Sequence, residues 1–153
     1  MREAVFSSLG AHVDGAVVLD LYAGSGSFGL EALSRGAASV TFVERDRFAL
    51  AALRANLDAV GLGGSIVASD VEAALGRQPG PFDLVFVDPP YSLSSPDLEP
   101  ILSAVSDRLE TGAVVLMHRR RDDVEVQTGG TLALTRRRRY GDAETWWYIK
   151  EAQ

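Results

Sequence analysis

The sequence contains no cysteine, no long apolar run and only two histidines, His12 and His118. A chain without cysteine can form neither a disulfide nor a thiolate metal site, and two isolated histidines are too few to indicate zinc. No stretch approaches the roughly 18 consecutive apolar residues of a membrane span, and residues 1–6 lack the apolar segment of a signal peptide. We therefore expect a cytoplasmic protein that uses no metal and does not cross a membrane.

The chain has a negative net charge, but its basic residues are unevenly distributed along the sequence. With 153 residues, 46% of them hydrophobic, the chain has the size and composition of one globular domain. Its formal net charge of -6 argues against indiscriminate binding to nucleic acid. However, residues 111–153 carry eight basic and six acidic groups, and seven of these basic groups form two clusters, Arg119–Arg121 and Arg136–Arg139. A local basic face could therefore meet a polyanion.

Four short apolar runs, each bounded by Gly, Pro, Asp or Ser, predict β-strands at residues 17–22, 39–43, 65–68 and 82–87. Unbroken apolar runs of this kind are typical of parallel strands that are covered on both faces. Helical patterns accompany them. One has an apolar stripe from Leu50 to Val60 and ends at Gly61. Another is predicted from residue 98 to near Glu110, with Asp97 as its N-cap and Pro100 in its first turn.

The last third of the chain changes from alternating strands and helices to strands alone. Residues 113–117, 132–140 and 145–149 read as strands, and the turn residues 140–143 predict an antiparallel hairpin between the last two. Residues 2–10 read as a further helix that ends at a glycine. The predicted fold class is α/β: a mostly parallel, doubly wound, seven-stranded sheet that ends in an antiparallel hairpin, which is the Rossmann-like architecture of class I methyltransferases.

A glycine-rich loop follows the first predicted strand, at the sheet edge where α/β proteins bind nucleotides. Gly24, Gly26 and Gly29 form G-x-G-x-x-G, so a dinucleotide is one interpretation of the loop. Two details favour S-adenosylmethionine: Asp20 can accept a hydrogen bond from a cationic amino group, and no basic residue in the loop awaits a pyrophosphate. The candidate cofactor-binding residues here are Asp20, Tyr22, Ala23, Gly24, Ser25 and Gly26.

Two more acidic residues lie where the second and third predicted strands end. Glu44 is placed to take both ribose hydroxyls, with Arg45 beside it; the alternative is a surface carboxylate in a charged run. Asp70 is placed to accept from an adenine amino group, and Val71 offers a backbone N–H. Asp70 can also be the N-cap of a helix over residues 71–75, and one residue can fill both roles.

The candidate catalytic residues are Asp88, Pro89, Pro90 and Tyr91, which follow the buried strand 82–87. The lone pair of an exocyclic amine is delocalised into its ring, so an enzyme must localise it. Asp88 and the carbonyl of Pro89 could accept the two amine hydrogens, while Tyr91 stacks on the base. Positioning and electrostatics would then supply most of the acceleration. The alternative interpretation is a proline-rich turn that Asp88 caps.

Several segments together resemble the RsmD family, S-adenosylmethionine-dependent methyltransferases that modify the exocyclic N2 of a guanine in 16S ribosomal RNA. They are residues 2–6, 19–26, 30–37, 42–44, 88–91 and 140–142. The resemblance implies cofactor binding at Asp20, Gly24, Gly26, Glu44 and Asp70, and catalysis at residues 88–91. Family members usually begin with a further basic segment that helps to engage RNA. We therefore expect residues 1–153 to be a single methyltransferase domain that lacks this segment.

Other acceptors and another class of protein remain open at this point. The same tetrapeptide would suit an adenine or cytosine amine in DNA, or a glutamine amide in protein. A non-catalytic nucleotide- or RNA-binding module is the alternative of another class. For the RNA or small-subunit substrate, we expect Arg119, Arg120 and Arg121 to contact phosphates.

Overall fold

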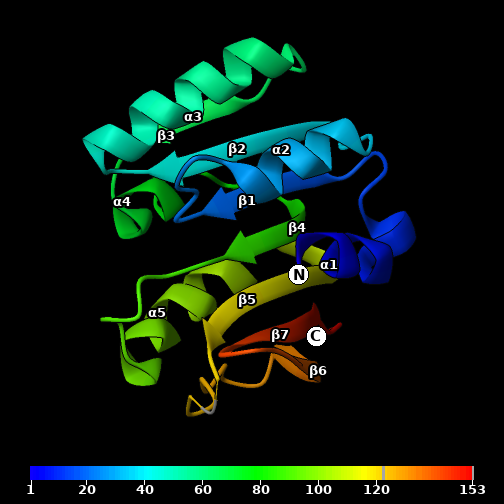
Figure 1. Cartoon of the computed structure of the whole chain (residues 1–153). Coiled ribbons are helices and arrows are strands. Elements are labelled where there is room, and N and C mark those ends of the chain that lie inside the picture. The colour runs from blue at the N-terminus through cyan, green and yellow to red at the C-terminus, as the bar shows by residue number, and fades with distance from the viewer. Residues whose placement is uncertain (122, 153) are drawn as a thin grey trace.

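The computed structural model describes residues 1–121 and 123–152. It contains one seven-stranded sheet with the strand order β3-β2-β1-β4-β5-β7-β6 (Figure 1). The strands are β1 (Val17–Leu21), β2 (Ser39–Glu44), β3 (Ser65–Ala68), β4 (Phe82–Val87), β5 (Leu109–Arg120), β6 (Leu132–Tyr140) and β7 (Ala143–Lys150). The pairs among β1 to β5 are parallel, and β7 runs antiparallel to both β5 and β6. The predicted α/β architecture with its antiparallel hairpin is confirmed.

The helices cover both faces of the sheet. They are α1 (Arg2–Leu9), the 3-10 helix η1 (Gly10–His12), α2 (Ser27–Ser34), α3 (Arg47–Val60), α4 (Val71–Leu75) and α5 (Ser95–Ser106). Apolar residues of α1, α2 and α3 form one buried cluster, and those of α4 and α5 form another. Val18 and Leu19 of β1 belong to opposite clusters because successive side chains of a strand point to opposite faces. None of these helices is long and apolar enough to cross a membrane.

The start of α5 differs from our prediction. The N-cap is Ser94 and not Asp97: the Ser94 hydroxyl accepts from the Asp97 N–H (3.3 Å), and the Asp97 carboxylate accepts from the Ser94 N–H (2.8 Å). The hydrogen bonds from the Ser94 backbone and hydroxyl hold the pKa of Asp97 below its usual value. Because this capping box starts the helix earlier, Pro100 lies in the second turn and not in the first.

The end of α5 also differs, because the sheet competes for the residues that follow it. We expected the helix to continue to near Glu110, but it ends at Ser106. The Arg108 carbonyl accepts from the Phe82 N–H at 2.8 Å, and Leu109 pairs with Phe82 in the parallel ladder. Leu109, which fits the apolar stripe of the helix, is therefore the first residue of β5.

We predict that Ser94→Ala lowers the free energy of unfolding by about 1 kcal/mol, since it removes the hydroxyl that satisfies an unpaired N–H of the first helical turn. The measurement is urea unfolding at neutral pH. Ser103→Ala is the matched control, because Ser103 is exposed in the body of the same helix and makes no cap. Equal losses in the two variants would contradict the capping role.

Candidate functional site

A cleft of about 600 Å³ lies at the sheet edge where the first four strands end. Its lining includes seven residues that the sequence assigns to a site: Tyr22, Glu44, Arg45, Asp70, Val71, Asp88 and Pro90. The sequence did not indicate the six that complete it: Val43, Asp46, Ser69, Glu72, Ser92 and Leu93. Each of these six lies within three positions of a predicted residue in the chain, so they enter the cleft as neighbours of the predicted set.

Two glycines of the G-x-G-x-x-G motif, Gly26 before α2 and Gly29 within it, pack closely against neighbouring side chains. Gly26 has φ of 92°, and a Cβ there would lie 2.4 Å from a methyl carbon of Leu53. A Cβ at Gly29 would lie 2.3 Å from a ring carbon of Phe42. At these two positions the absence of a Cβ lets the backbone approach the core, and the role of the loop glycines toward a ligand stays a prediction.

The loop backbone is held at several points. Tyr22 has φ of 56°, in the left-handed region that residues other than glycine rarely adopt. The Ala23 N–H donates to the Val43 carbonyl at 3.0 Å, and the Asn56 side chain donates to the Ser25 carbonyl at 2.9 Å. Sequence reasoning missed Asn56, because an asparagine within a helix carries no signal of a loop contact. The loop is therefore fixed by the protein itself.

Glu44 is a fixed carboxylate at the end of β2. One oxygen accepts from the Gly24 N–H at 2.8 Å, and the other accepts from the N–H groups of Arg45 (3.0 Å) and Asp46 (2.9 Å). These bonds hold the carboxylate in one place at the cleft wall. A carboxylate has about four acceptor positions, so three backbone donors do not exhaust it. Its contact with ribose stays a prediction.

Asp70 occupies the position of an N-cap, as one of its two expected roles requires. Its carboxylate accepts from the Ala73 N–H at 2.7 Å, which begins α4 at Val71. The N–H of Val71 belongs to the first turn of the helix, where no intrahelical acceptor exists. Asp70 and Val71 both line the cleft. Their contact with adenine stays a prediction.

Asp20 lies beneath the glycine-rich loop. Only 2% of the residue is exposed, and one carboxylate oxygen accepts from the Gly29 N–H at 3.0 Å. Burial raises the pKa of Asp20 well above its usual value; the Gly29 hydrogen bond opposes this, and the charges of Asp88 and Glu44 add to it. Burial separates Asp20 from the cleft wall, and its contact with a cationic amino group stays a prediction.

The cleft is strongly acidic. Five carboxylates and one guanidinium line it: Glu44, Asp46, Asp70, Glu72, Asp88 and Arg45. Such a wall attracts a cation and repels the two negative charges of a pyrophosphate. The charge of the cleft therefore favours a sulfonium compound over a dinucleotide. Among the residues that the structure describes, no group of histidine, aspartate and glutamate side chains could hold a metal ion.

The segment that follows β4 brings the candidate catalytic residues to the edge of this cleft. The Asp88 side chain is 43% exposed, and one of its oxygens lies 2.9 Å from Nδ1 of His118. Pro89 is buried, and the Pro90 carbonyl accepts from the Leu93 N–H at 3.0 Å. The role of the Pro89 carbonyl toward an amine stays a prediction.

Tyr91 is 49% exposed, and the Arg120 guanidinium lies 4.6 Å from its ring centroid. Sequence reasoning missed this contact, and it dismissed His118 as an isolated histidine. β4 and β5 pair in parallel up to Val87 and Met117, so the next residue of β5, His118, lies beside Asp88. This register is known only from the structure, and the sequence carried no signal of it.

The first arginine cluster does not form a shared phosphate-binding surface. Arg119 is only 2% exposed, donates to the Leu93 carbonyl at 3.0 Å and pairs with Asp123 at 3.1 Å. Our expectation that Arg119 contacts phosphate is therefore wrong. Its neighbours Arg120 and Arg121 are exposed. Strand alternation explains the difference, because Arg119 points to the opposite face from Arg120.

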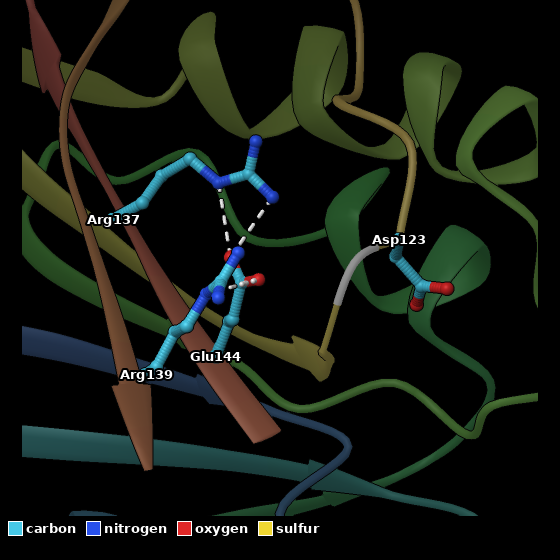
Figure 2. Close-up of a pocket in the computed structure, with 4 residues that line it drawn as sticks. All are labelled: Asp123, Arg137, Arg139 and Glu144. Atoms are coloured by element: carbon cyan, nitrogen blue, oxygen red, sulfur yellow. Dashed lines mark hydrogen bonds and ion pairs between the residues drawn. The ribbon is translucent and has the colours of Figure 1, made fainter. Parts of the chain in front are cut away.

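The second arginine cluster alternates across β6, as predicted for a strand. Arg137 and Arg139 point toward Glu144 of β7, with contacts of 2.9 and 3.6 Å (Figure 2). Only 1% of Glu144 is exposed, so the two arginines compensate a buried carboxylate. Arg136 points to the other face, where its guanidinium lies 5.2 Å from the ring centroid of Trp147. At most half of this cluster can therefore meet one ligand.

Comparison with known proteins places these features in one family. The family model described as "Conserved hypothetical protein 95" matches residues 1–149. "Putative rRNA methyltransferase YlbH" of Bacillus subtilis is 36% identical over 151 residues, which cover 92% of this chain and 79% of that protein. "Ribosomal RNA small subunit methyltransferase D" of Escherichia coli K12 is 41% identical over 92 residues, which cover 60% of this chain and 46% of that protein.

A solved structure from Streptococcus pyogenes, titled as a conserved hypothetical protein, has the same fold with a TM-score of 0.89. It is 29% identical to this chain, and the match covers 99% of this chain and 96% of that one. The likeness therefore extends over the sheet, both helix layers and the C-terminal hairpin.

We predict that Asp20→Asn changes how stability depends on pH. Because the folded-state pKa of Asp20 is raised above an unfolded value of about 3.9, the stabilising effect of its proton is complete below that pH and is lost as pH rises through the folded-state pKa. Asparagine still accepts from Gly29 but cannot ionise, so the variant should gain stability over the wild type as pH rises from about 4.

Urea unfolding between pH 4 and pH 8 measures this difference. Asp58→Asn, at an exposed position of α3, is the control and should follow the wild type. A difference between wild type and Asp20→Asn that stays constant with pH would contradict the prediction.

Proposed function

The chain belongs to the family described as conserved hypothetical protein 95, which is the RsmD family, and on that premise we propose that it is an S-adenosylmethionine-dependent methyltransferase of ribosomal RNA. The proposed acceptor is the exocyclic N2 amine of a guanine in the small-subunit RNA. The observation that carries the proposal is the acidic cleft that ends at Asp88. Because ribosomes assemble in the cytoplasm, we propose that location too.

The cleft suits S-adenosylmethionine in charge. The cosubstrate supplies an electrophilic methyl group on a positively charged sulfur, and the sulfur keeps the electron pair when the methyl leaves. The carboxylates of the cleft, with Glu44 fixed by three backbone N–H groups, stabilise that positive charge before transfer. We propose that Glu44 binds the ribose and that Asp70 and Val71 bind the adenine. The loop of residues 22–26, which follows Asp20, borders the methionine portion in this proposal.

The residues at the end of β4 are proposed to hold the acceptor amine. Asp88 and the Pro89 carbonyl accept its two hydrogens, which localises the nitrogen lone pair and turns it toward the methyl carbon. As the new nitrogen–carbon bond forms, the amine gives up one proton, and in this proposal Asp88 accepts it. The exposed ring of Tyr91 stacks on the base.

For the RNA backbone we propose Arg136 and Arg138 in place of Arg119. Both are exposed on the edge strand β6, on the face opposite Glu144. Through Thr145 of β7, Arg138 lies in register with His118, so it shares the sheet edge and the face of the Asp88 contact. A row of charges on an edge strand can also serve to prevent aggregation through that edge. The salt dependence of RNA binding distinguishes this role from contact with phosphates.

We predict that the protein transfers labelled methyl groups from S-adenosylmethionine to N2 of one guanine in small ribosomal subunits that lack the modification. Asp88→Asn should lower the rate by on the order of 10²–10³-fold, because it weakens the acceptor that localises the amine lone pair. Mapping the labelled nucleotide is the measurement. Label on adenine, in DNA or in protein would overturn the proposed substrate.

Calorimetry with the same two proteins is the control for this assay. Both should bind S-adenosylmethionine, and neither should respond to NADH, since the acidic cleft repels a pyrophosphate. Uptake of NADH without uptake of S-adenosylmethionine would overturn the cofactor assignment.

We predict that Arg136→Gln together with Arg138→Gln weakens RNA binding and flattens its dependence on salt. Each lost phosphate contact should reduce the slope of log K against log salt by roughly 0.7 to 0.9. Arg137→Gln, one position along on the other face, is the matched control and should leave the slope unchanged, because Arg137 pairs with Glu144. Equal slopes in the double variant and the wild type would reject the RNA surface.

A further inference from the structure

The end of β5 extends past the end of β4. The parallel ladder between these strands stops at Val87 and Met117, but β5 continues to Arg120. Over residues 118–120 its partner is β7, with pairs to Thr145, Glu144 and Ala143. These three residues of β5 therefore run beside the segment that follows β4, residues 88–93, and a paired strand holds them in place.

Each of the three contacts a different point of that segment. His118 contacts the Asp88 carboxylate at 2.9 Å, Arg120 lies 4.6 Å from the ring centroid of Tyr91, and Arg119 donates to the Leu93 carbonyl at 3.0 Å. His118 and Arg120 lie on one face of the strand and Arg119 on the other, so the segment is held from both faces.

Of the three residues, His118 bears most directly on the proposed reaction, because it contacts the carboxylate of Asp88. An ionised carboxylate only accepts hydrogen bonds, so Nδ1 of the ring must carry the hydrogen. The other ring nitrogen, Nε2, is buried and has no partner in the part of the chain that the structure describes. Asp88 is therefore the polar group for which this ring is oriented.

We propose that His118 is a positioning residue for methyl transfer: its Nδ1–H occupies one oxygen of Asp88 and thereby aims the other oxygen at the acceptor amine. The proposal rests on the function proposed above. His118 itself touches neither the amine nor the methyl group, and it acts through the orientation of Asp88. Loss of this hydrogen bond leaves the carboxylate free to rotate, which lowers the fraction of bound substrate that is ready to react.

The test compares two substitutions at one position. His118→Leu keeps the volume and removes the donor, and it should lower kcat by on the order of 10²-fold while the Kd for S-adenosylmethionine stays within about twofold. His118→Asn places an amide N–H near the former Nδ1 and should restore most of kcat. His12→Leu, at the exposed second histidine in η1, is the control and should behave as the wild type.

The outcomes separate this inference from the proposed function. A wild type that transfers no methyl group would overturn both. An active wild type whose kcat is unchanged in His118→Leu would overturn the inference alone. The inference would also be overturned if His118→Asn had the melting temperature of the wild type and yet the low kcat of His118→Leu. The same holds if His118→Leu weakened cofactor binding and left kcat unchanged.

Discussion

The close approach of α2 to the sheet is the constraint on which the cofactor side of the cleft depends. A glycine at position 29 lets the helix backbone lie against the ring of Phe42, and the carboxylate of Asp20 takes the Gly29 N–H in the same place. Because helix, ring and carboxylate meet within van der Waals distance, the loop of residues 22–26 has little freedom. A larger residue at position 29 would push α2 outward and move the loop with it.

The carboxyl edge of the sheet has an acidic region and a basic region. Carboxylates gather in the cleft beside β1 to β4, whereas arginines gather on β5 and β6 at the other end. The net charge of -6 hides this division, since the acidic groups lie mainly before residue 110. A cationic cosubstrate and a polyanionic RNA would each meet the sign of charge that attracts it, and Asp88 and Tyr91 lie where the two regions meet.

Much of the fold could be predicted because local signals agreed with the global arrangement. Apolar runs of four to six residues marked the parallel strands, and Gly61 marked the end of α3, where it has φ of 69°. The misplaced N-cap of α5 was a local error, since Ser94 and Asp97 are three positions apart, whereas the other errors arise from contacts that are distant in the sequence. The pairing of Phe82 with Leu109 shortened α5, and the burial of Arg119 depends on a carbonyl 26 positions away. The contact between His118 and Asp88 required the register of two strands, which periodicity does not provide.

The hairpin at the end of the chain supports one side of the site only. The residues that line the cleft all precede residue 94, and the strands that carry them pair without β7. The part of β5 that carries His118 and Arg120, by contrast, is paired by residues 143–145. The ladders between the strands of the cleft therefore do not include β7, whereas the support for Asp88 depends on it. A one-residue slip of that last strand pair would not empty the cleft, yet it would alter the support beneath the group that is proposed to receive the proton.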